Sequence, residues 1–303
     1  MAEKSANRRP HVLILMPDQL RADCMSCAGH PAVRTPNLDR IAAEGTRFTN
    51  AYTTSPICMP ARSSVLSGLY CHNHGQWSNY GQLPADADTF ARRLWAAGYH
   101  TCHVGKSHYY PHHGQHLSEH VPFLNALGWR DVFETTGPHA TKTTDSIVTD
   151  HWRRLGCLDT FRDDYAARGK AGPFAATWPS PMPAGETLDD FVGRTAVEYV
   201  QRYDSPEPLC LFVGFPGPHE PWDPPVDWAA QYDPADMDGP LPPCEPPEWV
   251  PPAAAEHQRR LERLPEAYSP QAVGKIRALY YGKISHIDSW IGRIIEALGE
   301  RGM

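Results

Sequence analysis

A cysteine and an arginine near the start of an expected helix form the segment of this sequence best suited to chemistry. Cys58 and Arg62 are separated by three residues within the segment 55–68. Pro60 suits the first turn of a helix and Gly68 suits its end. Cys58 then lies at the helix N-terminus, where free backbone N–H groups and the helix dipole favour an anion, and Arg62 adds a positive charge one turn later. The segment therefore predicts a site that holds a sulfate or phosphate ester next to a thiol.

Alternating strands and helices are expected to position this segment. Residues 11–16, 99–104 and 209–213 are predicted to form strands. The apolar run within 11–16 indicates a buried first strand, and the continuous apolar run at 209–213 is typical of a buried parallel strand. The periodicity and the capping residues predict helices at 36–44, 60–68 (with Val65 and Leu66 on the buried side), 88–97, 187–203 and 271–299. This alternation predicts an α/β fold with a mostly parallel central sheet flanked by helices.

One long stretch lacks any such periodicity. Residues 216–252 are dense in proline and too long for an ordinary connection. We expect them to form an ordered excursion over the active-site face. The tryptophans Trp222, Trp228 and Trp249 indicate that this excursion packs against the rest of the chain.

Composition narrows the classes of function. The chain has 303 residues and a formal net charge of −7 without a run of Lys or Arg, which disfavours a nucleic-acid partner. The early apolar run is too short for a signal-peptide core or a membrane span. We therefore expect no membrane contact, a cytoplasmic location and reduced cysteines for the eight that the sequence contains.

The pattern C-x-P-x-R at residues 58–62, followed by L-S-G, resembles the signature of the sulfatase family, whose cysteine is oxidised after translation to formylglycine. Further segments agree with that family in the same order, namely the strand and Pro-Asp-Gln at 11–19, T-P-N-L-D at 35–39 with G-T-R-F at 45–48, G-K-S-H at 105–108 and F-P-G-P-H-E-P at 215–221. The resemblance implies an alkaline-phosphatase-like sandwich with one catalytic domain over residues 1–303. Its active site is expected at the carboxyl ends of the strands.

The resemblance also implies a sulfuric ester hydrolase whose nucleophile derives from Cys58. One hydroxyl of the hydrated formylglycine attacks sulfur and expels the alcohol; the second then loses its proton and sulfate is eliminated. His108 is implied as the residue that handles the diol proton. Lys106 and Arg62 are implied as charge stabilisers. His219 is implied as the general acid on the leaving-group side.

A divalent metal beside the nucleophile is implied in the same way. Asp18 is the expected ligand, with Gln19 beside it and an oxygen of modified Cys58 as a further ligand. Oxygen ligands favour a hard cation, so we expect Ca²⁺ first, with Mg²⁺ or Mn²⁺ as alternatives. An unmodified thiolate suits Ca²⁺ or Mg²⁺ poorly, so a formylglycine-generating maturation enzyme is an expected partner.

Two departures from the family pattern leave alternatives open. Many members carry two acids where this chain has Asp18 and Gln19, and an Asp-Gln pair also occurs in related phosphonate monoester and phosphodiester hydrolases, in which Asn79 could contact the substrate. The family's other metal-binding pair normally follows a strand after the last helix, so we expect a truncated, incomplete domain. The remaining alternative is an inactive fragment or anion-binding module that lacks half of the metal site. The substrate is expected to be a small-molecule or carbohydrate sulfate ester, and the sequence does not indicate its alcohol part.

Overall fold

The computed structural model describes residues 9–172, 175–240, 249–262 and 269–303. Within them lies one four-stranded parallel sheet in the order β1-β4-β2-β3. Its strands are β1 (Val12–Leu15), β2 (His100–Lys106), β3 (Asp131–Thr135) and β4 (Leu209–Gly214). Three of them were predicted, whereas β3 was missed. The predicted α/β class with a parallel sheet is confirmed.

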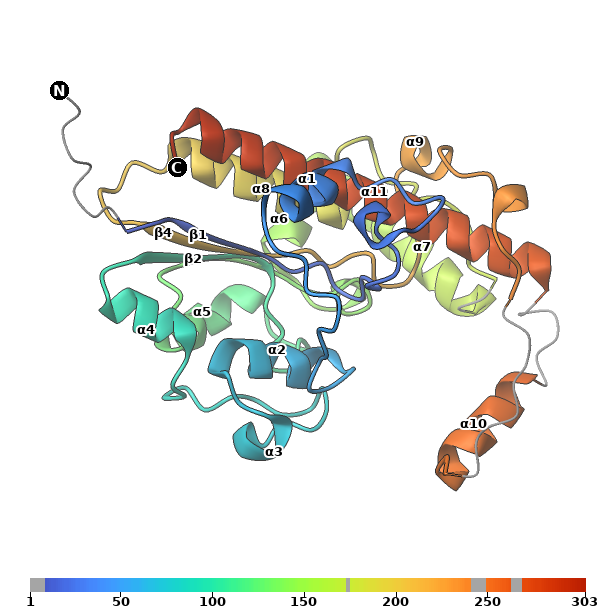
Figure 1. The fold of residues 1–303 in the computed structure, drawn as a ribbon, viewed down its shortest axis with the longest axis horizontal. Helices are drawn as coiled ribbons and strands as arrows, with labels where there is room; N and C mark the ends of the chain where they lie inside the picture. The colour runs from blue at the N-terminus through green and yellow to red at the C-terminus, as the bar shows by residue number, and fades with distance from the viewer. Residues whose placement is uncertain (1–8, 173–174, 241–248, 263–268) are drawn as a thin grey trace.

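Helices cover both faces of the sheet (Figure 1). The α-helices are α1 (Pro36–Glu44), α2 (Cys58–Ser67), α3 (Cys71–His74), α4 (Phe90–Ala96), α5 (Val121–Ala126), α6 (Ile147–Leu155), α7 (Leu158–Ala171), α8 (Leu188–Arg202), α9 (Val226–Ala229), α10 (Pro252–Glu262) and α11 (Pro270–Glu300). Short 3₁₀ turns are η1 (Ser26–Ala28), η2 (Leu117–His120), η3 (Ala140–Lys142) and η4 (Pro234–Asp236). Helices α8 and α11 lie on one side of the sheet, and α2, α4 and α5 lie on the other.

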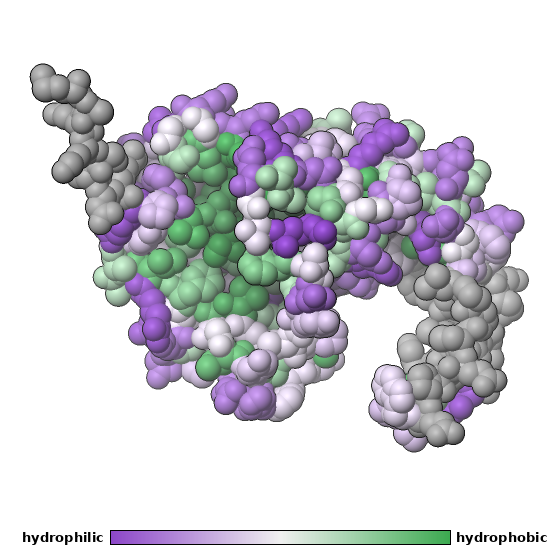
Figure 2. Space-filling model, viewed as in Figure 1, coloured by the Kyte–Doolittle hydropathy of each residue, from purple (hydrophilic) through white to green (hydrophobic). Residues whose placement is uncertain are grey.

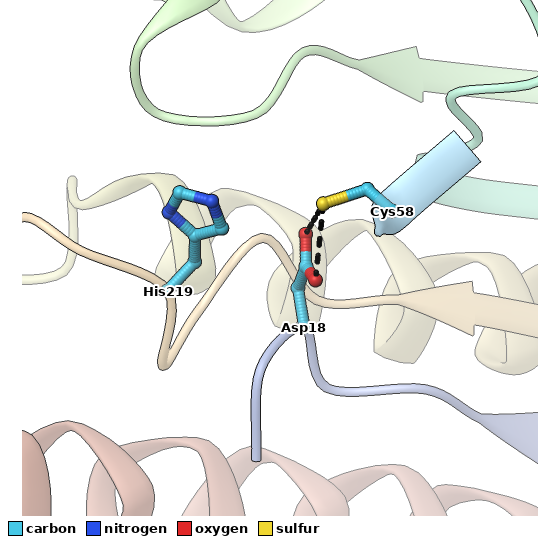
Figure 3. Close-up of side chains that lie close together, drawn as sticks. All are labelled: Asp18, Cys58 and His219. Carbon is cyan, nitrogen blue, oxygen red and sulfur yellow. Dashed lines mark hydrogen bonds between the residues drawn. The ribbon is translucent and has the colours of Figure 1, made fainter. Parts of the chain in front are cut away.

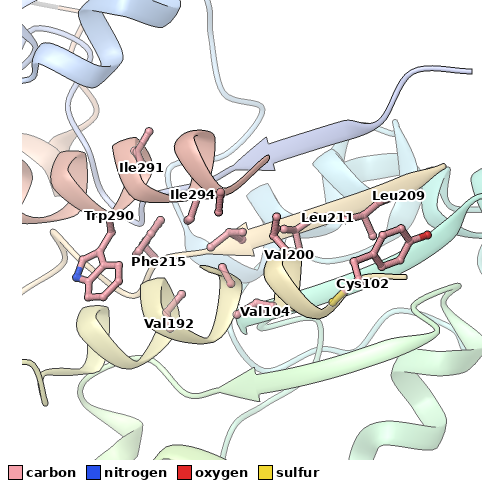
Figure 4. Close-up of a cluster of buried hydrophobic side chains, with 14 of the residues drawn as sticks. Cys102, Val104, Val192, Val200, Leu209, Leu211, Phe215, Trp290, Ile291 and Ile294 are labelled. Atoms are coloured by element: carbon pink, nitrogen blue, oxygen red, sulfur yellow. The ribbon is translucent and has the colours of Figure 1, made fainter. Parts of the chain in front are cut away.

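The main hydrophobic core lies between the sheet and the pair α8 and α11 (Figure 4). Val192 and Val200 of α8 face Ile291 and Ile294 of α11, and all four are fully buried. These positions repeat at the helical spacing that predicted the two amphipathic helices. A second core on the other face packs α2, α4 and α5 against β4.

Strand β1 is less buried than the sequence predicted. It is the edge strand of the sheet in the described part of the chain, and all four of its residues are only half-buried. Its side chains Leu13 and Leu15 line a groove of about 510 Å³ together with Ile295 and Leu298 of α11. Figure 2 shows hydrophobic surface gathered over this side of the sheet.

Helix α1 is joined to α11 by the T-P-N-L-D segment. The Asp288 carboxylate accepts hydrogen bonds from the backbone N–H groups of Asn37 at 3.1 Å and Leu38 at 2.8 Å, and from the Asn37 amide at 2.9 Å. These are free N–H groups of the first turn of α1, which need acceptors. The segment therefore fixes α1 on α11.

The structure corrects two details of the predicted packing. Val65 was predicted on the buried side of α2 but is 46% exposed. Leu66 alone of this pair packs into the second core. In the proline-rich stretch, Trp228 packs against His286 of α11 with ring centroids 5.5 Å apart, as predicted, but Trp249 is 81% exposed. Residues 241–248 of that stretch lie outside the described residues.

Two further observations concern the cysteines and the helices. The cysteines of the described residues are all free thiols. Among those residues we find no helix with the length and apolar character needed to cross a membrane.

Candidate active site

The carboxyl ends of neighbouring strands bring the predicted residues together. Asp18 follows β1, Lys106 ends β2, and His219 lies in the loop after β4. The Asp18 backbone N–H contacts Phe215 O at 3.0 Å and Gly217 O at 2.8 Å, so the loops after β1 and β4 are joined directly. Parallel strands end at one edge of a sheet, and this geometry explains why residues far apart in sequence meet there.

Cys58 faces Asp18 from the N-terminus of α2 (Figure 3). Its Sγ lies 3.9 Å from each oxygen of the Asp18 carboxylate. One ligand atom from each of Asp18, Cys58 and His219 lies within 4.8 Å of the others. A nucleophile precursor, a carboxylate and an imidazole therefore share one small volume.

Two cations neutralise Asp18. Lys106 Nζ donates a short hydrogen bond to its Oδ2, and Arg62 Nη2 lies 3.6 Å from the same oxygen. Burial alone would raise the pKa of Asp18, but Lys106 and Arg62 outweigh it and lower that pKa to about 2. Asp18 is therefore ionised at neutral pH.

Arg62 offers the site an unused donor. The side chain is 1% exposed, and its Nη1 donates to Lys106 O at 2.6 Å. Its Nη2 has no hydrogen-bond partner among the described residues. A buried guanidinium N–H group without a partner is costly, and the oxygen of an anionic ester would satisfy it.

The first turn of α2 is held by Asn79. Asn79 Oδ1 accepts a hydrogen bond from the Met59 backbone N–H at 3.0 Å, which satisfies one of the free N–H groups of the helix start. This contact fixes the helix turn that carries Cys58. A contact between Asn79 and substrate stays a prediction.

His108 lies in a strained loop directly after β2. Its backbone φ is 52°, which is the left-handed region that few residues other than glycine adopt. Its Nδ1 is buried without a hydrogen-bond partner in the part of the chain described. Burial, together with Lys106, lowers the pKa of His108 to about 2, so its ring is neutral in this state of the site.

Glu134 of β3 anchors that loop, and sequence reasoning missed it. Its carboxylate accepts hydrogen bonds from Ser107 Oγ, from Tyr110 OH at 2.5 Å and from His112 Nε2 at 3.2 Å. Ser107 stands between Lys106 and His108 in the sequence. Glu134 thus holds the loop that presents both of them.

His219 is oriented by its neighbour Glu220. Its Nδ1–H donates to Glu220 O at 2.6 Å and lies 3.3 Å from Glu220 Oε2. His139 Nε2 lies 3.8 Å from the other carboxylate oxygen. Because Nδ1 carries this proton, Nε2 of the neutral ring is an acceptor, and the ring points toward Cys58 and Asp18. Sequence reasoning missed both His139 and Glu220.

A buried ion cluster supports the same loop from behind. Lys283 Nζ of α11 donates to Asp223 Oδ1 at 2.5 Å and to the backbone oxygens of His219 at 3.3 Å and Pro221 at 3.2 Å. Asp189 of α8 accepts from the Gly217 backbone N–H at 2.8 Å. The two core helices therefore fix the loop that carries His219.

Gln19 follows Asp18 directly and lies on the surface. Its side chain is exposed, and its φ of 67° turns the chain away after Asp18. It lines a cavity together with Trp222 and Tyr280. As a metal ligand, Gln19 stays a prediction.

The donor set fits a divalent metal in part. Asp18 supplies a hard, ionised oxygen ligand, whereas the Cys58 thiol and the His219 imidazole suit softer metals. Replacing the Cys58 sulfur by oxygen would make the pair at residues 18 and 58 suitable for a hard cation.

A parallel α/β sheet with a helix-bound nucleophile precursor, a carboxylate and an imidazole at its carboxyl edge defines an anion-binding hydrolase scaffold. The sequence matches the Sulfatase family over residues 10–303, and the chain belongs to this family. Its fold is that of the sulfatases and their alkaline-phosphatase-like relatives.

Individual relatives agree with this assignment. An arylsulfatase of Clostridium perfringens is 29% identical over 97% of this chain and 60% of its own length. An N-acetylglucosamine-6-O-sulfatase of Bacteroides thetaiotaomicron is 26% identical over 73% of this chain and 33% of its own length. The phosphonate monoester hydrolase structure of Agrobacterium radiobacter has a TM-score of 0.71 and 25% identity over 97% of this chain and 60% of its own. The chain thus spans about 60% of the first of these curated relatives.

Proposed function

We propose that this chain is a sulfuric ester hydrolase that cleaves a sulfate monoester with a formylglycine nucleophile derived from Cys58. The observation that carries the proposal is the position of Cys58 Sγ, 3.9 Å from both Asp18 oxygens at the N-terminus of α2. The unused Nη2 of buried Arg62 supports it, because this donor suits an anionic sulfate oxygen.

Asp18 and an oxygen of modified residue 58 would hold a divalent metal, with Ca²⁺ as the proposed ion. The chemistry that such a metal would supply there is polarisation of a sulfate oxygen and stabilisation of the ionised nucleophile. Hydration of the formylglycine aldehyde supplies the attacking hydroxyl, and its second hydroxyl allows sulfate to be released afterwards. Modification at Cys58 requires a maturation enzyme as a partner.

The remaining steps belong to side chains of this chain. Lys106 and Arg62 orient and neutralise the sulfate group. His219 Nε2, which faces the cluster, gives a proton to the leaving alcohol oxygen as the ester bond breaks. His108 is the proposed acceptor of the proton of the second hydroxyl when sulfate leaves. This role requires the negative charge of the bound sulfate to counteract Lys106 and raise the lowered pKa of His108.

A phosphonate monoester hydrolase is the second candidate. The Asp18-Gln19 pair and the likeness to the Agrobacterium radiobacter enzyme favour it. Values of kcat/KM on 4-nitrophenyl sulfate and on 4-nitrophenyl phenylphosphonate separate the two. We expect the sulfate to be preferred; preference for the phosphonate would replace the first proposal with the second.

The decisive test combines mass spectrometry with activity. The peptide that contains Cys58 is analysed after expression in a host that matures other sulfatases, and we expect the lower mass of the aldehyde. Cys58→Ala and Arg62→Lys variants should lose hydrolysis, while Cys71→Ala, at a buried cysteine outside the cluster, serves as the control. An unmodified Cys58 thiol in such a host would contradict the proposal. Absence of metal-dependent hydrolysis despite modification would favour the inactive-fragment alternative.

We also propose a cytoplasmic location, for which the free cysteines of the described residues are the support. Immunoblotting of fractionated host cells tests it, and recovery of the protein outside the cytoplasm would contradict it.

A further inference from the structure

A large cavity lies beside the candidate active site, and the reaction described above makes no use of it. Its volume is about 610 Å³, which is within the usual range for small-molecule sites. Its wall includes Gln19, directly after Asp18, and Trp222, three residues after His219. Two loops of the catalytic cluster therefore continue into this cavity.

The opposite wall is the first half of α11. Figure 1 shows that this half of the helix extends beyond the ends of the strands, at the same end of the sheet as the loops after β1 and β4. Tyr280 OH of α11 donates to Gln19 O at 2.8 Å and accepts from the Arg21 backbone N–H at 3.0 Å. The cavity wall is thus held to the loop after Asp18 by defined contacts.

The charges of the cavity wall are paired with one another. Arg21 forms a two-bond pair with Asp23, at 2.9 and 2.6 Å, and Arg277 lies 3.9 Å from Asp238. The wall therefore has two positive and two negative side chains and no excess charge. Among the described lining residues each of the two arginines thus has a carboxylate partner, which disfavours an alcohol with further anionic groups.

The uncharged groups of the wall suit hydroxyl groups and a sugar ring. Trp222 is half-buried, and its ring has neither an aromatic neighbour nor a hydrogen-bond acceptor for its N–H group among the described residues. The Gln19 amide, which is exposed, adds a donor and an acceptor. A flat aromatic face with polar groups around it binds the apolar face of a sugar ring and the hydroxyls at its edge.

We propose that this cavity binds the alcohol part of the substrate, and that this alcohol is a neutral sugar residue stacked on Trp222. The proposal rests on the proposed function, because it assigns the leaving group of the same reaction. It deepens that function by favouring glycosyl sulfates over polyanionic substrates. Choline-like and aryl alcohols, which an aromatic face also binds, are the competing outcomes of the test below.

Binding of the sulfate-free alcohol tests the cavity without requiring catalysis. The full chain is labelled with 5-fluorotryptophan, and the Trp222 resonance is identified by its loss in Trp222→Phe. Neutral monosaccharides (glucose, galactose, N-acetylglucosamine and fucose) are titrated and followed by ¹⁹F NMR, with choline and phenol as comparisons. We expect at least one sugar to shift the Trp222 resonance saturably and more strongly than choline or phenol.

Variants show whether the cavity is responsible. Trp222→Ala should weaken sugar binding about tenfold in calorimetry, which is the order expected for loss of one stacked aromatic ring. Trp249→Ala, at an 81% exposed tryptophan, should leave the binding constant unchanged. Circular dichroism and the unfolding midpoint confirm that both variants fold.

Two outcomes would overturn the proposal: no monosaccharide shifts the Trp222 resonance, or choline or phenol shifts it more strongly than any sugar does. Neither outcome bears on Cys58, whose modification and hydrolytic activity are measured separately. A sugar-binding cavity beside an unmodified Cys58 would contradict the proposed function and leave the cavity assignment intact.

Discussion

Glu134 should make the stability of this protein depend on pH near neutrality. Its side chain is 3% exposed and receives hydrogen bonds from Ser107, Tyr110 and His112. Burial raises the pKa of Glu134 from 4.5 to about 7, and the bonds from Ser107 and Tyr110 offset only part of this rise. The folded protein therefore binds a proton at Glu134 that the unfolded chain releases near pH 4.5.

The direction and size of the effect follow from linkage. The pKa is higher in the folded state, so the stabilising contribution is complete below pH 4.5 and is lost as pH rises through about 7. Each pH unit between these values corresponds to about 1.4 kcal/mol, so the contribution of Glu134 to the free energy of unfolding should fall by about 3 kcal/mol in total. Buried histidines with a lowered pKa, such as His103 and His108, act in the opposite direction, so the effect of Glu134 is the difference between the unsubstituted chain and a variant at residue 134. Glu134→Gln keeps an uncharged side chain of the same shape and should remove this loss.

Urea unfolding at pH 4.5, 6 and 8 measures the effect. The control is Glu119→Gln, at an exposed carboxylate in η2, which should retain the pH dependence of the unsubstituted chain. The reasoning about Glu134 is refuted if its Gln variant and the unsubstituted chain lose the same free energy between pH 4.5 and 8. If the free energy of unfolding instead rose with pH in the unsubstituted chain but not in Glu134→Gln, the hydrogen bonds to Glu134 would lower its pKa by more than burial raises it.

Two further substitutions test how the loops of the site are held. Lys283→Met should lower the free energy of unfolding by about 3–5 kcal/mol, because it leaves the buried carboxylates of Asp189 and Asp223 without their cation. Lys275→Met, at an exposed position of the same helix, is the control and should change this free energy little. Equal losses for the two variants in urea unfolding would contradict the reasoning. Gly105→Ala should lower the unfolding midpoint far more than Gly114→Ala. Both glycines have a φ near +90°, but of the two only Gly105 has backbone in the way of an added Cβ, which would lie 2.2 Å from Gly214 O. Similar thermal unfolding midpoints in the two variants would refute this steric argument.

Local patterns predicted most of the fold because its elements have strong local signals. The predicted strands and helices lie within a few residues of β1, β2, β4, α1, α4, α8 and α11. Strand β3 was missed because Asp131–Thr135 has charged residues among few apolar ones, and it is half-buried over its first three positions. The predicted burial of β1 was wrong because edge position is a property of the sheet order, and an apolar run does not determine that order.

The cluster of Cys58, Asp18, Lys106 and His219 could be predicted because each residue lies at a strand end or a helix start. Its supports were missed because their partners are distant in sequence. Lys283 did carry a signal: it stands three residues after Tyr280 and four before Ile287, on the apolar stripe of the last helix. A lysine in such a stripe indicates a buried counter-charge, although the sequence does not identify that charge as Asp223.

The charges around Asp18 link anion binding to the protonation of His219. Lys106 and Arg62 carry two positive charges and Asp18 carries one negative charge, so this group attracts an anionic ester. Burial and Lys106 also lower the pKa of His219, which keeps its ring largely neutral in the absence of an anion. A sulfate group that arrives with its own negative charge counteracts Lys106 and raises the pKa of His219. In the proposed mechanism the ring therefore gains the proton required of a general acid when a substrate anion is present. The cations proposed to bind the ester would also prevent premature protonation of that acid.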